Sequence, residues 1–450
     1  MTTSSTSPAS GAAHGTIGAV LRNRNFVLLW SGMMVSNTGS WMQTVILPAY
    51  IDQRTESGLW VGLFTFALLG PVLLLSVVGG VMADRFPRKP WLAGMQSLQL
   101  VMTVVIAALV SRDAGLVWIL LAQLVAGVGN ALNNPAMQGV LPNMVDPRDI
   151  GGVVSLNSVG INGSRVVGPV IAAVLMARGV STSQVLLINA ATFLAVIAAI
   201  LAATFPPREQ ATQSRGWANV THGIRLAARR SVLGRLLGGM AIFSFFCLPW
   251  VGLFAPITRL NLHLDSRTAT YKWLYATWGL GALVGALALG TVLAHVDKAR
   301  LIRPLLIGFA VTVCVFGLLR SVTLAFPVAF VLGWFYFAMA TSKLTVIQHN
   351  LRSNERARVM ALWFMGFGGT VAIGNLAFGP VIDAIGPRPV MLMGGAVALG
   401  LSWWCDVPNR RLRLLADDDP PSGAVHQRLG DPLQPGDAAA LDQDGVAAGD

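Results

Sequence analysis

The feature that most limits what this chain can fold into is a succession of long apolar runs. Charged, Pro-containing or Gly-containing segments separate them, and each run holds about 20 predominantly apolar residues, the length at which a helix crosses the hydrocarbon core of a bilayer. A single soluble core cannot bury so many apolar runs, because such a core stops growing at about 250 to 300 residues. We identify twelve runs, at 26–51, 59–82, 91–110, 116–137, 153–177, 184–204, 236–257, 273–293, 301–319, 324–347, 359–382 and 390–405.

The composition agrees with a membrane protein. Of 450 residues 54% are hydrophobic and 12% are charged, whereas an ordinary globular domain is about a quarter charged. The three cysteines lie inside apolar runs without the spacing of a ligand set, so we expect no disulfide, no metal site and no cofactor. The net charge of +12 is compatible with nucleic acid or with anionic lipid headgroups, and only the positions of the charges can distinguish the two.

Those positions favour the lipid interpretation and predict an orientation. If the N-terminus is cytoplasmic, 21 of the 32 basic residues fall on inner loops and ends and 8 on outer ones, as the positive-inside rule requires. We therefore expect a multi-pass protein of the bacterial cytoplasmic membrane, with both termini cytoplasmic and no nucleic-acid partner.

The longest polar interval before the tail divides six runs from six. It predicts a cytoplasmic arm at 1–24, a six-helix bundle at 25–205, a cytoplasmic linker at 206–235, a second six-helix bundle at 236–407 and a disordered cytoplasmic tail at 408–450, rich in Pro, Gly and Asp. Short matches between the halves recur about 210 residues apart, for example Leu141 with Leu351 and Gly168 with Gly379. Such an offset suggests a duplication, which is a common plan among transporters.

One predicted inner loop crowds charges into a few positions. The stretch GGVMADRFPRKP at 79–90 resembles the loop between the second and third helices of the major facilitator superfamily. Pro87 stands where that pattern usually has Gly. The matching residues, which we predict to form a gating loop, are Gly80, Asp84, Arg85, Arg88 and Lys89.

Further stretches resemble one branch of that superfamily. FVLLWSGMMVSNTGSWMQTVILP, ALNNPAMQGVLPNMV and NSVGINGSRVVGPVIAA are similar to exporters that include macrolide-efflux and enterobactin-export proteins. The resemblance implies an all-α membrane fold of twelve transmembrane helices in two six-helix bundles.

The resemblance also implies a role for the gating loop. In the family the loop carboxylate contacts the N-terminal end of a neighbouring helix, where negative charge is stabilised, and the arginines pair with acids, which latches the two halves. The alternative is that the charges only set topology. Three bases would suffice for topology without Asp84, which favours the gate.

The fifth run contains RVVGP, which resembles the antiporter motif of the superfamily, although Ala172 and Ala173 replace its usual glycines. A proline kinks a helix, and small neighbours let another helix approach closely. A plain packing kink therefore remains an alternative to an antiporter function. The residues that we assign to kinking and packing are Arg165, Gly168 and Pro169, with Gly379 and Pro380 in the second half.

In the family the first, fourth, seventh and tenth spans face a central cavity. Amides there are costly against lipid and indicate a wet or protein-facing surface, and aromatic side chains suit an amphiphilic organic ligand. Hydrogen bonds between helices, without a ligand, are the alternative for each amide. The predicted substrate-binding residues are Asn37, Trp41, Asn130, Asn134, Gln138, Trp250, Tyr336 and Lys343.

Two basic residues, Arg165 and Lys343, fall inside spans that contain no deep Asp or Glu. A charge at such depth is a functional hypothesis by default. We expect Lys343 to attract an anionic group of the substrate, and Arg165 to bind backbone carbonyls or amides of the fourth span. Lys343 and His349 are the candidates for carrying a coupled proton.

The sequence thus predicts a monomeric, proton-coupled secondary exporter of small amphiphilic molecules, such as a drug, siderophore or secondary metabolite. An uptake permease for an organic anion is the first alternative, and a non-transporting membrane sensor or enzyme is the second. The chain lacks the Walker A, H-E-x-x-H and G-x-S-x-G patterns, so we expect no enzyme and assign no catalytic residue.

Overall fold

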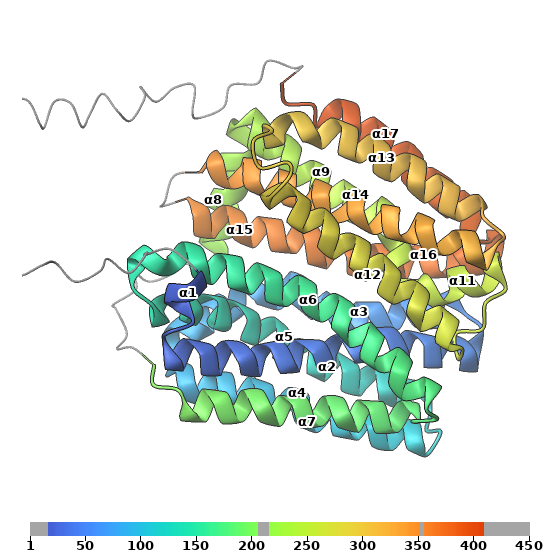
Figure 1. Cartoon of the computed structure of the whole chain (residues 1–450), viewed down its shortest axis with the longest axis horizontal. Helices are drawn as coiled ribbons and strands as arrows, with labels where there is room; N and C mark the ends of the chain where they lie inside the picture. The colour runs from blue at the N-terminus through green and yellow to red at the C-terminus, as the bar shows by residue number, and fades with distance from the viewer. Residues whose placement is uncertain (1–16, 206–215, 352–354, 409–450) are drawn as a thin grey trace, which may run out of the picture.

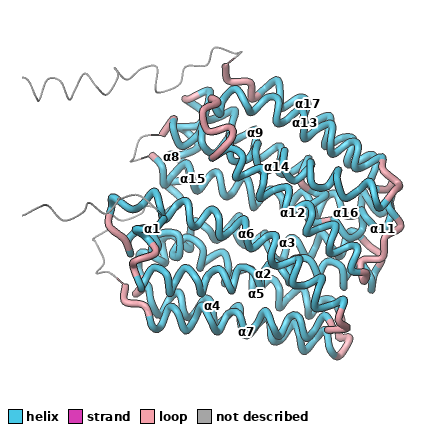
Figure 2. The backbone as a smooth tube through the Cα atoms, in the orientation of Figure 1, coloured by secondary structure: helices cyan, strands magenta, loops and turns pink. Residues whose placement is uncertain are grey.

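The computed structural model describes residues 17–205, 216–351 and 355–408, and the regular elements in these ranges are all helices (Figures 1 and 2). The first half is coloured blue to green in Figure 1. Its elements are α1 (Ile17–Val20), α2 (Arg24–Thr55), α3 (Gly58–Arg85), α4 (Arg88–Ser111), α5 (Leu116–Val140), η1 (Leu141–Met144), η2 (Pro147–Asp149), α6 (Ile150–Ala177) and α7 (Thr182–Ala202).

The second half begins with a short helix and continues in a bundle that lies beside the first (Figure 1). Its elements are α8 (Gly216–Arg229), α9 (Ser231–Cys247), α10 (Pro249–Gly252), α11 (Phe254–Leu262), α12 (Ala269–Gly290), α13 (Lys298–Leu318), α14 (Val322–His349), α15 (Arg356–Phe364), the π-helical turn η3 (Met365–Gly369), α16 (Thr370–Ile385) and α17 (Pro387–Trp404).

Local signals explain where several helices begin. The Ser181 hydroxyl accepts from the backbone N–H of Gln184, whose side chain accepts from the backbone N–H of Ser181 in return, so α7 opens with a capping box. The side chains of Asn23 and Thr268 each accept one bond from a backbone N–H in the first turn of α2 and α12, so they act as simple N-caps. The chain breaks before α10 at Pro249, which has no N–H to continue the helical ladder.

Eight helices in the described ranges are long and apolar enough to cross a membrane, or nine if the pair Thr221–Arg229 and Ser231–Cys247, bent by 118°, is one span. The chain is therefore a multi-pass membrane protein. The expected all-helical fold is confirmed. Twelve spans are consistent with the element order when α9 to α11 form one pass, α15 to α16 form another, and α2, α3 and α17 each form one.

The halves meet along two seams. In the first half α3 packs on α5, α4 on α7, and α2 on both α6 and α7; in the second, α12 packs on α14 and α13 on α17. Between the halves, α3 packs on α16 and α6 on α12.

The two ends of the bundle are distinguished by their loops (Figure 1). We call the end that carries α1, α8 and the α3–α4 loop the linker end. The opposite end, where α2 passes into α3 and α11 into α12, is called the far end.

Candidate functional site

A cavity of about 250 Å³ lies between the halves and is lined from both. The first half contributes all the amide side chains of the lining, from α2, α4 and α5, together with apolar side chains of α2, α3, α5 and α7. The second half contributes aromatic and small apolar side chains from α10 to α12 and α16. The lining residues used below are Trp41, Gln43, Thr44, Gln99, Gln123, Asn130, Phe254, Tyr271 and Tyr275.

Three buried amides, which we call the amide chain, hold the wall of the first half. The Asn189 amide on α7 donates to Gln43 Oε1 on α2 at 2.7 Å, and Gln43 Nε2 donates to Gln123 Oε1 on α5 at 2.8 Å. A buried amide is costly unless it is hydrogen-bonded. The amide chain therefore fixes three helices relative to one another and sets the orientation of Gln43 and Gln123 at the cavity.

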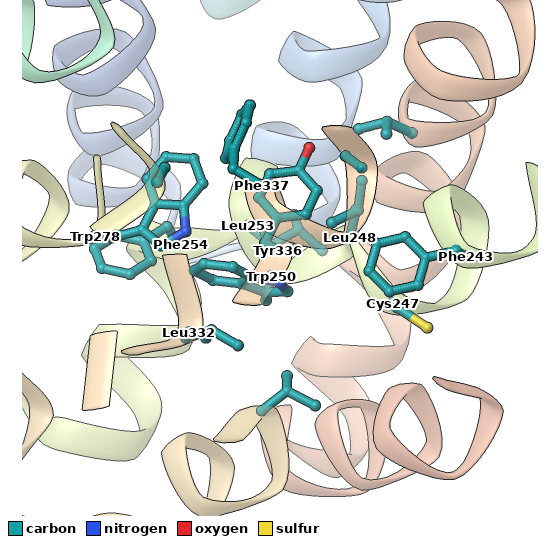
Figure 3. Packing of buried hydrophobic residues seen from close by; sticks show 14 of the residues in the cluster. Phe243, Cys247, Leu248, Trp250, Leu253, Phe254, Trp278, Leu332, Tyr336 and Phe337 are labelled. Atoms are coloured by element: carbon teal, nitrogen blue, oxygen red, sulfur yellow. The ribbon is translucent and has the colours of Figure 1, made fainter. Parts of the chain in front are cut away.

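Contacting rings hold the wall of the second half (Figure 3). Trp278 crosses Trp250 at 5.4 Å between centroids and stacks on Tyr336 at 6.2 Å. Edge-to-face and offset contacts of this kind are favourable, although the indole nitrogens of Trp250 and Trp278 are buried without a hydrogen-bond partner in the described ranges. This aromatic cluster comprises Phe243, Trp250, Phe254, Tyr271, Tyr275, Trp278, Phe309, Phe316, Tyr336, Phe337, Trp363 and Phe367.

The structure places the predicted substrate-binding residues in three groups. Trp41 and Asn130 line the cavity. Asn134 is exposed and donates to Asn130 Oδ1 at 3.2 Å, and Gln138 is exposed one helical turn further toward the linker end, where its Oε1 accepts from Asn157 at 3.3 Å. The third group lies outside the lining: Asn37 is half-buried on α2, Trp250 and Tyr336 belong to the aromatic cluster, and Lys343 is buried in the second half.

Sequence reasoning missed several residues of the lining. Gln43, Gln99 and Gln123 are amides inside apolar runs, so the argument that selected Asn130 applies to them equally. Tyr271 and Tyr275 lie where α12 begins, in a span that the family pattern does not assign to the cavity. Only the packing of α12 beside α6 and α14 brings them there.

Arg165 does not occupy the position that we expected. Its guanidinium lies between two rings, 5.1 Å from the centroid of Trp41 and 4.3 Å from that of Phe337. Nε and Nη1 are buried without a hydrogen-bond partner. The expected bonds to carbonyls or amides of the fourth span are therefore absent at these two nitrogens, because the two rings flank the guanidinium instead.

Lys343 is fully buried among residues of its own half. Its Nζ lies 5.7 Å from the ring centroid of Phe243 and has no hydrogen-bond partner in the described part of the chain. Lys272 provides a contrast: it is equally buried, but its Nζ donates to the backbone carbonyls of Ser266, Arg267 and Thr268. An ammonium without acceptors is costly in an apolar surrounding.

At the far end, side chains join the two halves. Arg259 on α11 forms a two-point ion pair with Asp52 on α2, with both N···O distances at 3.0 Å, and donates to the carbonyl of Glu56 at 2.8 Å. Asp383 on α16 accepts from the backbone N–H of Gly58 at 2.6 Å and of Leu59 at 3.1 Å. A carboxylate at a helix N-terminus is stabilised, so Asp383 fastens the start of α3 to the other half.

The predicted gating loop lies at the linker end. Lys89 donates to the carbonyl of Ala203 at 3.2 Å, within its own half, and Arg88 begins α4. Gly80, Asp84 and Arg85 lie on the last turns of α3, and their side chains fall outside the described residues. His349 lies at the linker end of α14 and lines a second cavity of about 410 Å³ with His295 and Asp297.

The residues assigned to kinking lie where helices approach closely. A Cβ added at Gly168 would lie 2.6 Å from Trp41 Cβ and 2.7 Å from the carbonyl oxygen of Thr38, so α6 touches α2 there. A Cβ added at Gly58 would lie 2.7 Å from the carbonyl oxygen of Gly379, so α3 and α16 touch at the other seam. Pro169 and Pro380 follow inside α6 and α16.

Sequence comparison finds relatives among transporters. The chain is 22% identical over 389 residues to the staphyloferrin A transporter of Staphylococcus aureus, which covers 84% of this chain and 95% of that one. It is 25% identical over 331 residues to the enterobactin exporter EntS of Citrobacter koseri, covering 71% of this chain and 76% of that one.

Solved structures share the fold. The nucleoside transporter NupG has a TM-score of 0.69 at 13% identity and covers 84% of this chain and 97% of its own. A bacterial homologue of the lysosomal transporter Spinster, inward-facing and occupied, has a TM-score of 0.67 at 17% identity and covers 89% of this chain and 99% of its own.

A family model described as transmembrane secretion effector matches residues 16–429. This match covers both halves and all the cavity residues described above, and it confirms the family resemblance that the sequence motifs carried. The chain therefore belongs to the transmembrane secretion effector family of the major facilitator superfamily, a family of transporters rather than of enzymes.

Proposed function

We propose that this protein exports small amphiphilic organic molecules across the bacterial cytoplasmic membrane. The observation that carries the proposal is the apolar cavity between the halves, in which the amide groups come from the first half and the rings of Phe254, Tyr271 and Tyr275 from the second. Such a combination suits a molecule with an apolar body and a few polar groups. The names of the relatives, a staphyloferrin A transporter and an enterobactin exporter, support a siderophore or a comparable secondary metabolite as cargo.

The proposed mechanism is alternating access. The far-end contacts Asp52–Arg259 and Asp383 with α3 both join the halves. The described ion pairs at the linker end, Arg230–Glu355, Arg300–Asp297 and Arg303–Asp406, each lie within the second half. This asymmetry supports a state closed at the far end, and export would require those contacts to break while the linker end closes.

We infer that the linker end faces the cytoplasm, as the basic loops favour. Under this orientation the far-end contacts are an outer gate, and the predicted gating loop with Asp84, Arg85, Arg88 and Lys89 belongs to the inner one. Proton coupling with Lys343 as carrier, and His349 as the alternative, completes the proposal. A monomer suffices, because the proposed transport path lies within one chain.

Transport in vesicles of known sidedness tests this function. We expect inverted membrane vesicles that contain the protein to accumulate iron-free enterobactin or ethidium when energised, and vesicles without it to accumulate neither. Uptake in right-side-out vesicles with none in inverted ones would favour the organic-anion permease instead. Chemical conversion of either probe would contradict a transporter.

The outer gate gives a more local test. Asp52→Asn removes the charge that holds Arg259, so the far end should open more readily. A cysteine introduced at Thr44 in the cavity should then react several-fold faster with a membrane-impermeant maleimide added at the far side. Asp406→Asn breaks an ion pair within one half and serves as the matched control. Equal labelling in the two variants would contradict a gating role for Asp52.

A further inference from the structure

Arg165 lies where three helices meet. Gly168, one turn along α6, touches α2 at Trp41, and a Cβ added at Gly279 on α12 would lie 2.9 Å from the carbonyl oxygen of Arg165. The packing of α6 on α12 is one of the two seams between the halves. A ligand that binds the Arg165 side chain would therefore act at a seam that moves in the proposed alternating-access mechanism.

The two rings that flank its guanidinium come from different halves. Trp41 belongs to α2 and Phe337 to α14. Cation–π contacts of this kind stabilise the charge, but they provide no acceptor for the N–H groups of the guanidinium. Nε and Nη1 therefore remain as buried donors without an acceptor.

Among the described side chains no acid pairs with the charge of Arg165. The carboxylates of Asp52 and Asp383 are held at the far end by Arg259 and by the start of α3. Arg165 as a whole is half-buried, but Nε and Nη1 are removed from water without an acceptor. A buried donor of a charged group is costly when it is left unpaired, so these two donors lack a partner that a ligand could supply.

The surroundings of Arg165 continue into the cavity. Arg165 does not itself line the cavity, but Trp41 does, and its ring centroid lies 5.1 Å from the guanidinium. A ligand in the cavity therefore borders a ring that Arg165 also contacts. A planar carboxylate is the group that best matches the donors of a guanidinium.

We propose that Arg165 binds a carboxylate of the transported molecule, so that the cargo class is aromatic or amphiphilic carboxylic acids. This inference rests on the proposed function and narrows it. The carboxylate would take the place of the missing acceptor, while the apolar body lies against Trp41 and the aromatic cluster. Because the flanking rings belong to opposite halves, an occupied Arg165 also links cargo binding to the position of α6 against α12.

Binding of matched acid and amide pairs tests the proposal. We would use purified protein in lipid nanodiscs and three pairs of probes: 1-naphthaleneacetate with its amide, indole-3-acetate with its amide, and salicylate with salicylamide. We expect at least one acid to bind the wild type about tenfold more tightly than its amide, since an ion pair is available only to the acid. In Arg165→Gln the ratio should fall to about one.

Two further variants separate binding from folding. Arg165→Lys keeps the charge but not the planar group, so it should retain part of the preference for the acid. Arg178→Gln, an exposed arginine just after the same helix, should keep the full preference. Each variant must elute as the wild type does in gel filtration and unfold at a similar temperature before its ratio is interpreted.

The result that overturns the proposal is a wild type that binds no acid more tightly than its amide, or an acid preference that survives in Arg165→Gln. Failure of the proposed function has a different signature. If the acid preference depends on Arg165 but vesicles transport none of the bound acids, the carboxylate site stands and export fails. If vesicles export neutral probes and Arg165→Gln exports them normally, export stands and the carboxylate site fails.

Discussion

The two walls of the cavity are built by different chemistry. In the first half the amide chain joins α7, α2 and α5 through directional hydrogen bonds of 2.7 and 2.8 Å. In the second half rings contact one another at centroid distances of about 5 to 6 Å without directional bonds. A hydrogen bond weakens steeply when its angle changes, whereas stacked rings accept a range of offsets.

This difference assigns different tasks to the halves. The first half can fix the orientation of a polar group, because its donors and acceptors are held in place. The second half can accept apolar bodies of varied outline. The two cations with buried, unpartnered nitrogens follow the same division. Arg165 of the first half reaches the rings of Trp41 and Phe337 at the seam, while Lys343 stays inside the second half.

The largest effect is expected at Lys343. Lys343→Met keeps the volume and removes the only lysine or arginine of α14, so export driven by an imposed pH gradient in proteoliposomes should fall at least about tenfold, while downhill exchange of cargo continues. Lys272→Met is the matched control, because that lysine is equally buried but donates to three carbonyls. It should lower thermal stability and leave the response to the pH gradient unchanged.

An unchanged gradient response in Lys343→Met would remove Lys343 from the coupling mechanism. His349→Gln would then be the next variant to measure, because His349 lies at the linker end of the same helix. Loss of the response in both lysine variants would instead indicate damage to the fold.

An intermediate effect is expected when the amide chain is broken at its centre. Gln43→Leu leaves the Asn189 amide and Gln123 Oε1 without partners, and each buried unpaired group costs about 1 to 3 kcal/mol, with smaller values typical inside membranes. The midpoint of thermal unfolding in detergent should fall, and the export rate with it. Gln123→Leu removes the end of the chain and should cost about half as much. Equal stability of the two variants would contradict the idea that the wall acts as a connected unit.

The smallest effect is expected in the aromatic cluster. Tyr336→Phe preserves the ring stacked on Phe243 at 6.3 Å and on Trp278 at 6.2 Å, so export rates should stay within about twofold of the wild type. Tyr336→Ala removes the ring and should slow export of bulky aromatic probes more than that of small ones. A large loss in Tyr336→Phe would mean that the second half also depends on a directional polar group.

The fold was predictable from the sequence because the lengths of its apolar runs are set by the thickness of a bilayer. Trp41 and Asn130 were predictable as cavity residues because a helical stripe relates them to other polar positions. The ion pair of Asp52 with Arg259, 207 residues apart in the chain, was not, because nothing local relates one acid near a helix end to one base in the other half. The rings around Arg165 could not be predicted for the same reason, since Phe337 reaches it from the opposite bundle.

The crossing of α3 and α16 has a consequence for how the halves can separate. Gly58 lies against Gly379, and a Cβ added at Gly62 would lie 2.5 Å from the carbonyl oxygen of Asn375. Glycine has no side chain that could change rotamer to fill a gap between the two helices. A small separation of the backbones therefore opens a void too narrow for water, and the dispersion contact is lost. A partly opened seam is then less favourable than either a closed or a fully open one. The seam between α3 and α16 should therefore open in a two-state transition.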